Sequence, residues 1–164
     1  MRKYWYRRFL LVLLVLSVLG YTGYEVTKQQ EQGRKKEVSA DTVSSDTVIP
    51  GGMPGTKYLE EYKPLTGLLT SFYQKGGKVA AICAAPGVFE RLGFLKGRNA
   101  TSYPSVMEQL KSARTSLESV VVDGNVTTSR GLGTAIDFSL SLIGQLEGSA
   151  KAEEIAESVV YVRV

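Results

Sequence analysis

The stretch that decides the fold is Lys78-Val-Ala-Ala-Ile-Cys-Ala-Ala-Pro-Gly87. Its apolar run predicts a buried strand, and Cys83 is either the last residue of that strand or the first residue of the turn that follows. The small residues after Cys83 lead into a helix that carries Val88, Phe89 and Leu92. A strand, a tight turn and a helix with a nucleophile at the turn is the geometry of a nucleophile elbow, here with sulfur in place of a hydroxyl.

The predicted elbow gives Cys83 two properties that suit a nucleophile. It holds the thiol above the carboxyl edge of the sheet, where ligands bind in open α/β folds. It also places the thiol at the N-terminus of a helix, whose positive end favours the thiolate. The alternative is a buried cysteine that serves as a small hydrophobic residue. Cys83 is therefore the candidate nucleophile, with this alternative open.

The residues before the decisive stretch predict one strand and one helix. Thr47-Val-Ile49 reads as a short strand that stops at Pro50-Gly-Gly-Met-Pro-Gly55. A helix is indicated by apolar residues at i, i+3, i+4 and i+7, which are Leu65, Leu68, Leu69 and Phe72. Gly76-Gly77 ends that helix.

The residues after it predict a hairpin and two helices. Val120-Val-Val and Val126-Thr-Thr flank Asp123-Gly124, a strong hairpin signal. A helix begins at Gly133-Thr134, has Ile136, Leu140 and Ile143 on one stripe and stops at Gly148, and the last helix covers Lys151 to Val160. Strands alternating with helices predict an α/β domain with a mainly parallel sheet.

Two glycine-containing segments are candidates for binding an anion. Gly51-Gly52 ends the first strand, so the Gly52 N–H and the Ala84 N–H together are expected to face an oxygen bound near Cys83, as an oxyanion hole. Thr127–Thr134 is a glycine-punctuated loop in which Arg130 suits a substrate carboxylate or a partner subunit. For both segments an ordinary structural turn is the alternative.

Composition excludes several classes of function. The chain has 164 residues, no His and one Cys. It therefore lacks any Ser-His or Cys-His relay, any His-ligated zinc site and any thiolate cluster, and we predict no metal and no cofactor. The net charge is +5 for residues 1–40 and −1 for residues 41–164, so the body of the chain lacks the basic footprint of a nucleic-acid-binding protein.

The N-terminal part differs in character from the rest. Residues 1–27 are basic and then apolar, residues 28–46 form a polar linker, and residues 47–164 form the predicted domain. The apolar run begins at Phe9, and the twelve residues Phe9–Gly20 reach about 18 Å as a helix, short of the roughly 30 Å of a bilayer core. It suits a signal or short anchor, a buried strand or helix, or a start foreign to the domain. Membrane contact is expected only through residues 1–20, and the expected location is the cytoplasm, with export or anchoring as the alternative.

Four ordered segments resemble the DJ-one/ThiJ/PfpI family of the class I glutamine amidotransferase-like superfamily. They are Val48–Gly55, Val79–Pro86, Gly93–Gly97 with Ala100–Ser105, and Val122–Phe138. The resemblance covers about residues 47–160 and implies a flavodoxin-like three-layer sandwich, N-terminally incomplete or altered, and a homodimer. It also implies that Cys83 is the nucleophile and that Gly52 and Ala84 supply the oxyanion N–H groups.

The chain departs from the family pattern at three places. Family members open with a strand and a loop whose Glu hydrogen-bonds the Cys, and Glu25 is a poor match to that Glu. Tyr103 stands where some members have His and, with Arg130, is a candidate substrate or dimer contact. Leu132 stands where the family loop has Pro.

The resemblance implies a cysteine-dependent glyoxalase or deglycase that acts on reactive carbonyls such as methylglyoxal or on glycated protein. The alternatives are a non-catalytic redox-sensing chaperone and an inactive truncated member. Because the chain has no His, we do not expect a protease.

Overall fold

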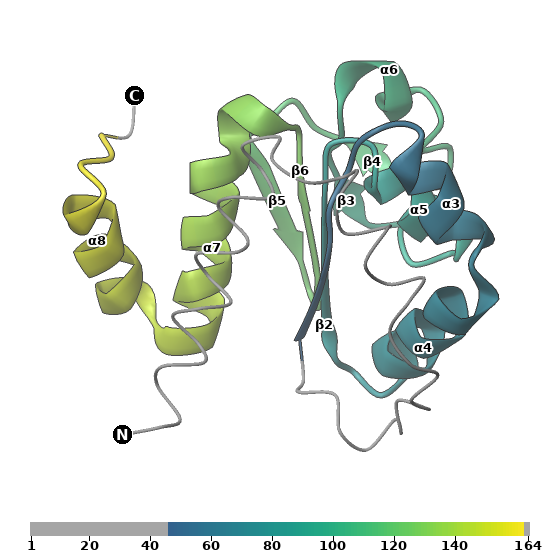
Figure 1. The fold of residues 1–164 in the computed structure, drawn as a ribbon, viewed down its shortest axis with the longest axis horizontal. Coiled ribbons are helices and arrows are strands. Elements are labelled where there is room, and N and C mark those ends of the chain that lie inside the picture. Colours follow the sequence, from purple (N-terminus) through teal and green to yellow (C-terminus); the bar gives the residue numbers. More distant parts are fainter. Residues whose placement is uncertain (1–45, 163–164) are drawn as a thin grey trace, which may run out of the picture.

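The computed structural model describes residues 46–162 as a sheet between two layers of helices (Figure 1). The segments 1–27 and 28–45, with Glu25, lie outside the described residues. The elements, in chain order, are β1 (Asp46–Ile49), α3 (Gly55–Glu61), α4 (Lys63–Gln74), β2 (Lys78–Ile82), α5 (Pro86–Arg91), β3 (Asn99–Ala100), α6 (Pro104–Met107), β4 (Arg114–Thr115), β5 (Val120–Asp123), β6 (Val126–Ser129), a 3-10 turn at Leu132–Thr134, α7 (Ala135–Glu147) and α8 (Ser149–Ser158).

The main sheet of the described residues has the order β1-β2-β6-β5. β1, β2 and β6 run parallel, whereas β5 and β6 form the antiparallel hairpin expected at Asp123-Gly124. β3 and β4 make a separate two-stranded parallel pair. The mainly parallel α/β architecture predicted from the sequence is therefore confirmed.

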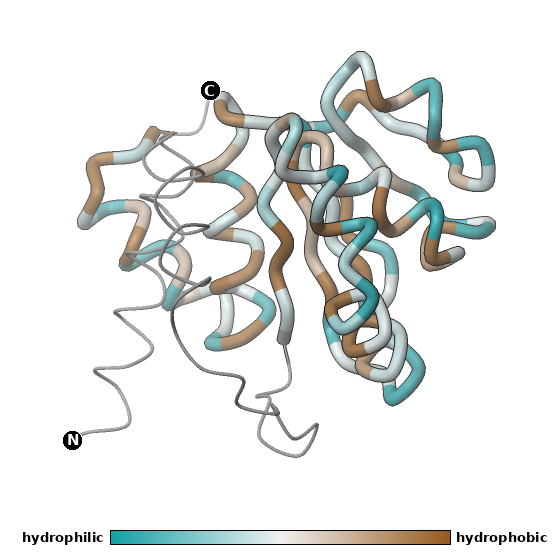
Figure 2. The backbone as a smooth tube through the Cα atoms, turned by 45° about the vertical axis from the view of Figure 1, so that its right-hand side comes forward, coloured by the Kyte–Doolittle hydropathy of each residue, from teal (hydrophilic) through white to brown (hydrophobic). Residues whose placement is uncertain are grey.

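β2 divides the hydrophobic core in two, because successive side chains of a strand point to opposite faces. Val79 and Ala81 join the core under α4 and α5, whose largest buried side chain is Phe89. Ala80 and Ile82 pack on the opposite face with Phe138 of α7. In Figure 2 brown stretches of the tube lie in the middle of the molecule, between the helices, as expected for a sheet that is covered on both faces.

The structure corrects three details of the helices. Leu140 and Ile143 pack against Ala152 and Ala156 of α8, whereas Ile136, predicted on the same stripe, is 43% exposed. The last helix runs from Ser149 to Ser158 rather than from Lys151 to Val160. The short helices α3 and α6 were not predicted, since neither has room for an apolar repeat.

The carboxyl ends of β1 and β2 lie so close together that position 51 has no room for a side chain. A Cβ built on Gly51 would lie 2.6 Å from the Cys83 Cβ and 2.7 Å from the Ala84 N, and it would also meet the carbonyl oxygen of Ile82. Glycine at position 51 therefore permits the backbone after β1 to lie directly on the turn after β2.

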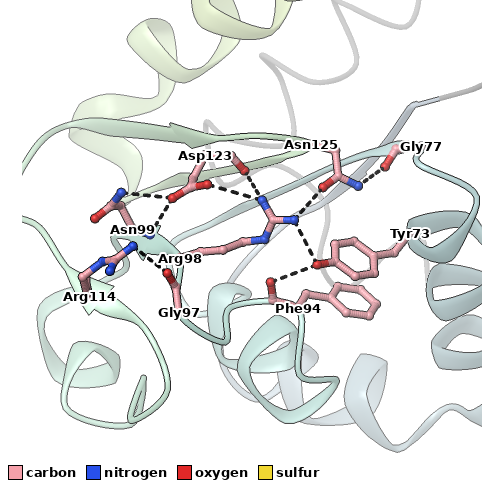
Figure 3. A network of polar contacts seen from close by, with 9 residues as sticks. All are labelled: Tyr73, Gly77, Phe94, Gly97, Arg98, Asn99, Arg114, Asp123 and Asn125. Atoms are coloured by element: carbon pink, nitrogen blue, oxygen red, sulfur yellow. Dashed lines mark hydrogen bonds and ion pairs between the residues drawn. The ribbon is translucent and has the colours of Figure 1, made fainter.

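A polar cluster around Arg98 ties the opposite end of the sheet together (Figure 3). The Arg98 guanidinium donates to the Asp123 carbonyl at 2.7 Å, to the Tyr73 hydroxyl at 3.2 Å and to the Asn125 side chain at 3.2 Å. Asn125 in turn donates to the Gly77 carbonyl at 2.9 Å. The cluster joins the β5–β6 turn to the end of α4 and to β3.

The Asp123 carboxylate is the anionic member of this cluster. The Asn99 backbone N–H donates to it at 2.8 Å and lowers the pKa of Asp123 below its ordinary value of 3.8. The Asn99 side-chain amide and the Arg98 guanidinium lower this pKa further, while partial desolvation opposes them. A lowered pKa means that the ionised carboxylate stabilises the fold above the ordinary pKa, and that this contribution disappears as the pH falls through the folded-state value.

Replacing Asp123 should therefore destabilise the protein in a pH-dependent way. We expect Asp123→Asn to lower the free energy of unfolding by about 1–2 kcal/mol at pH 7, because charge-assisted hydrogen bonds are lost. The difference from wild type should shrink as the pH falls below the ordinary value of 3.8 and through the lower folded-state pKa, as measured by urea denaturation across pH. Glu118→Gln, at an exposed carboxylate, is the control and should change little at any pH. A loss that stays the same at every pH down to acid unfolding would show that the charge of Asp123 has no part in the effect.

Replacing Gly51 tests the close approach of β1 to the turn after β2. Gly51→Ala should cost about 1–3 kcal/mol, since the added methyl group overlaps backbone atoms that cannot move alone. The control is Gly67→Ala inside α4, where a Cβ meets nothing within 4 Å and where alanine is the better helix former. Thermal unfolding of both variants should show a lower midpoint for the first and no loss for the second.

Candidate functional site

Cys83 occupies the turn directly after β2, with a φ of 64°. That left-handed conformation is uncommon for a residue with a side chain, and it is the strained backbone expected at a nucleophile elbow. The Cys83 N–H donates to the Ser129 carbonyl at 3.0 Å, and the Cys83 carbonyl accepts from the Tyr103 N–H at 2.8 Å. The end of β6 and the loop before α6 therefore hold the turn from two sides.

The Cys83 thiol is free and half-buried. Within residues 46–162 it makes no hydrogen bond, so no carboxylate of that part of the chain is bonded to it. The helix that follows, α5, has only six residues. In the described part of the chain no three His, Cys, Asp or Glu side chains gather into a set that suits a metal ion.

The two amides predicted as oxyanion donors lie on adjoining strand ends. Ala84 follows Cys83 in the turn, and Gly52 follows Gly51, whose backbone packs on that turn. Gly52 has a φ of 120°, which favours glycine, and its carbonyl accepts from the Thr56 N–H and the Thr56 hydroxyl. Neither the Gly52 N–H nor the Ala84 N–H donates to an acceptor within the described residues.

Tyr103 lies beside the elbow. Its backbone is bonded to Cys83, and it is the residue before Pro104, which starts α6. Its ring lies against Gly131, where a Cβ would be 3.5 Å from the Tyr103 Cδ2. Tyr103 thus joins the Cys83 turn to the loop after β6.

Arg130 lies in that loop, but its guanidinium points to a backbone group. Its Nη1 donates to the Leu117 carbonyl at 3.1 Å, which holds it against the segment before β5. Leu132, two residues further on, is exposed. The loop therefore exposes the apolar side chain of Leu132, while the Arg130 guanidinium is already hydrogen-bonded to a backbone carbonyl.

The sequence-based interpretation missed two hydroxyl groups that fix this loop. The Ser129 hydroxyl lies 2.7 Å from the Thr134 hydroxyl and donates to the Ser119 carbonyl at 2.7 Å. Thr134 also accepts from the Gly131 N–H at 3.1 Å. The available signal was a hydroxyl residue on each side of a glycine-rich turn, which is typical of side-chain-to-backbone bonding.

The described residues contain no helix that is long and apolar enough to cross a membrane. The short apolar run predicted as a signal or anchor lies outside them.

Comparison with known proteins finds one family. Residues 15–145 match the model of the DJ-1/PfpI family. Protein dj-1beta of Drosophila melanogaster is 37% identical over 155 residues, which cover 88% of this chain and 81% of that protein. The crystal structure of Drosophila DJ-1beta superposes with a TM-score of 0.72 and 38% identity over 76% of this chain and 68% of that chain.

Two further relatives differ more in length. Protein DJ-1 homolog B of Arabidopsis thaliana is 41% identical over 131 residues, or 74% of this chain, but that match spans only 30% of the plant protein. Glutathione-independent glyoxalase DJR-1.2 of Caenorhabditis elegans is 34% identical over 117 residues, which cover 71% of this chain and 62% of the worm protein. The fold, the motif order and these matches agree on the flavodoxin-like architecture, and the chain belongs to the DJ-1/PfpI family.

Proposed function

We propose that this protein is a cysteine-dependent glyoxalase or deglycase that acts on reactive carbonyls such as methylglyoxal, with Cys83 as the nucleophile. The observation that carries the proposal is the left-handed backbone of Cys83 at the end of a buried strand, with Gly51 packed on it. The similarity to the worm protein named as a glutathione-independent glyoxalase supports the same reaction class.

In the first step the Cys83 sulfur attacks the aldehyde carbon of the substrate. A carbon–sulfur bond forms, and the carbonyl electron pair moves to oxygen to give a hemithioacetal once that oxygen takes a proton. The Gly52 and Ala84 N–H groups, which have no acceptor within the described residues, suit the developing negative charge on this oxygen. No external cofactor is needed for this addition.

The second step moves a proton within the bound substrate. A base removes the proton from the carbon bonded to sulfur and a proton returns to the neighbouring carbon, so that the hemithioacetal becomes a thioester. Water then cleaves the thioester to release a 2-hydroxy acid and the free thiol. Glu25, outside the described residues, is the first carboxylate to test as that base.

The proposal extends to partners. The substrate is a small reactive carbonyl or a glycated protein, and a homodimer is expected, with Tyr103 and Arg130 as candidate contacts to substrate or to the second subunit. Nucleic acid is not expected, given the near-neutral charge of residues 41–164.

The test is consumption of methylglyoxal by the purified chain without glutathione, followed by release of lactate. Cys83→Ser should lower the rate at least ~100-fold, because the nucleophile is lost. Ser149→Ala, an exposed change at the start of α8, is the control and should keep the wild-type rate.

The competing function has its own readout. If no Cys83-dependent turnover is found and peroxide adds two oxygen atoms to Cys83 by intact mass, the redox-sensing alternative replaces the enzyme. If neither occurs while the protein is folded, Cys83 is a structural residue and both proposals fail.

A further inference from the structure

Two hydroxyl groups lie next to residues that contact the strained turn of Cys83. Ser129 is the last residue of β6 and is fully buried, and Thr134 is half-buried directly before α7. Their hydroxyl oxygens are 2.7 Å apart, and the Ser129 oxygen is also 2.7 Å from the Ser119 carbonyl oxygen. The reaction proposed above uses neither hydroxyl.

The two hydroxyls form one hydrogen-bonded series, because each has a single proton. Ser129 donates to the Ser119 carbonyl, so Thr134 is the donor in the contact between the two hydroxyls. The Gly131 carbonyl, at 3.0 Å, is the more distant acceptor for the Thr134 proton. The Thr134 oxygen itself accepts from the Gly131 N–H at 3.1 Å. The series therefore joins the loop after β6 to the segment before β5.

This series meets Cys83 at two points. The Ser129 carbonyl accepts from the Cys83 N–H at 3.0 Å. Ala135, directly after Thr134, belongs with Phe138 to the buried cluster against which the Cys83 side chain packs. The paired hydroxyls thus fix both an acceptor for the Cys83 backbone and a surface that its side chain contacts.

Cys83 needs such support because its φ of 64° is unfavourable for a residue with a side chain. A backbone conformation of this kind persists only where the surrounding contacts hold it. In a nucleophile elbow the sharp turn keeps the nucleophile exposed above the sheet. Relaxation of the turn would therefore move the thiol away from its reactive position.

We propose that Ser129 and Thr134 are positioning residues for the nucleophile. Their paired hydroxyls hold the Cys83 turn in its left-handed conformation and thereby keep the thiol reactive. They act through the Cys83 N–H and through Ala135, and they do not touch the substrate. This inference rests on the proposed function because it treats Cys83 as the nucleophile, but the reactivity of the thiol can be measured without turnover.

The experiment follows the alkylation of Cys83 by iodoacetamide, using intact mass. The sulfur forms a bond to carbon, iodide leaves and the thiol proton passes to the buffer. Thr134→Val removes one hydroxyl with little change of shape, and Ser129→Ala removes the other. Each should slow alkylation about threefold or more, the factor expected when one neutral hydrogen bond is lost. Partial unfolding would act in the opposite direction, because it exposes the half-buried thiol.

Two matched variants separate the hydroxyl from packing and from stability. Thr134→Ser keeps the hydroxyl and loses only the methyl group, so it should retain the wild-type rate. Thr70→Val makes the same chemical change at a half-buried position in α4, where the hydroxyl donates to the Thr66 carbonyl at 2.7 Å. It should also retain the wild-type rate, whatever its stability in urea.

Steady-state kinetics with methylglyoxal gives a second readout. Thr134→Val should lower kcat by a similar factor and leave KM unchanged, since its hydroxyl does not touch the substrate. If the wild-type chain consumes no methylglyoxal while the alkylation rates differ as expected, the positioning role stands and only the proposed reaction fails.

Three results would overturn the inference, with or without turnover. Alkylation of folded Thr134→Val at the wild-type rate shows that the hydroxyl pair stabilises the loop and does nothing for the thiol. An equal loss of rate in Thr134→Ser assigns the effect to packing of the methyl group. Faster alkylation of folded Thr134→Val shows that the pair restrains the thiol instead of keeping it reactive.

Discussion

The close contact between the end of β1 and the turn after β2 is the constraint on which the rest of the site depends. Gly51 lies where any side chain would overlap the Ile82 carbonyl oxygen, the Cys83 Cβ and the Ala84 nitrogen. Because the two strands are parallel and adjacent, their carboxyl ends meet at one edge, and the missing Cβ lets the chain after β1 lie directly on the turn after β2. The same contact brings Gly52 to the site. One glycine thereby positions a candidate oxyanion donor.

The two ends of the sheet have different roles. At the carboxyl end the backbone is strained at Cys83, amide donors lack partners within the described residues, and apolar side chains are exposed. At the amino end Arg98 and Asp123 form hydrogen bonds with one another and with neighbouring residues. This difference is expected when a rigid part of the fold, whose polar groups are hydrogen-bonded, supports a site whose polar groups are left free to bind a ligand.

β2 connects these two ends. Val79 and Ala81 fill one core, Ala80 and Ile82 fill the other, and the strand finishes at the strained turn of Cys83. Since both faces are buried, β2 cannot slip in register without moving apolar side chains into the wrong layer. The position of the thiol is therefore fixed by packing on both sides, together with the bonds from Ser129 and Tyr103.

The sequence alone determined the features that depend on local pattern. The β2–Cys83–α5 turn, the α4 helix and the β5–β6 hairpin are local, since each follows from a short periodic run and its turn residues. Tertiary structure alone decided the long-range features. It placed Gly51, and not Gly52, where a Cβ would overlap the turn after β2. It also brought Arg98 to Asp123 and Tyr73, and it directed the Arg130 guanidinium to the Leu117 carbonyl. In addition, it decided that Leu140 and Ile143 pack against α8. A periodic pattern shows that a helix has an apolar face, but only the packed neighbours determine what that face meets.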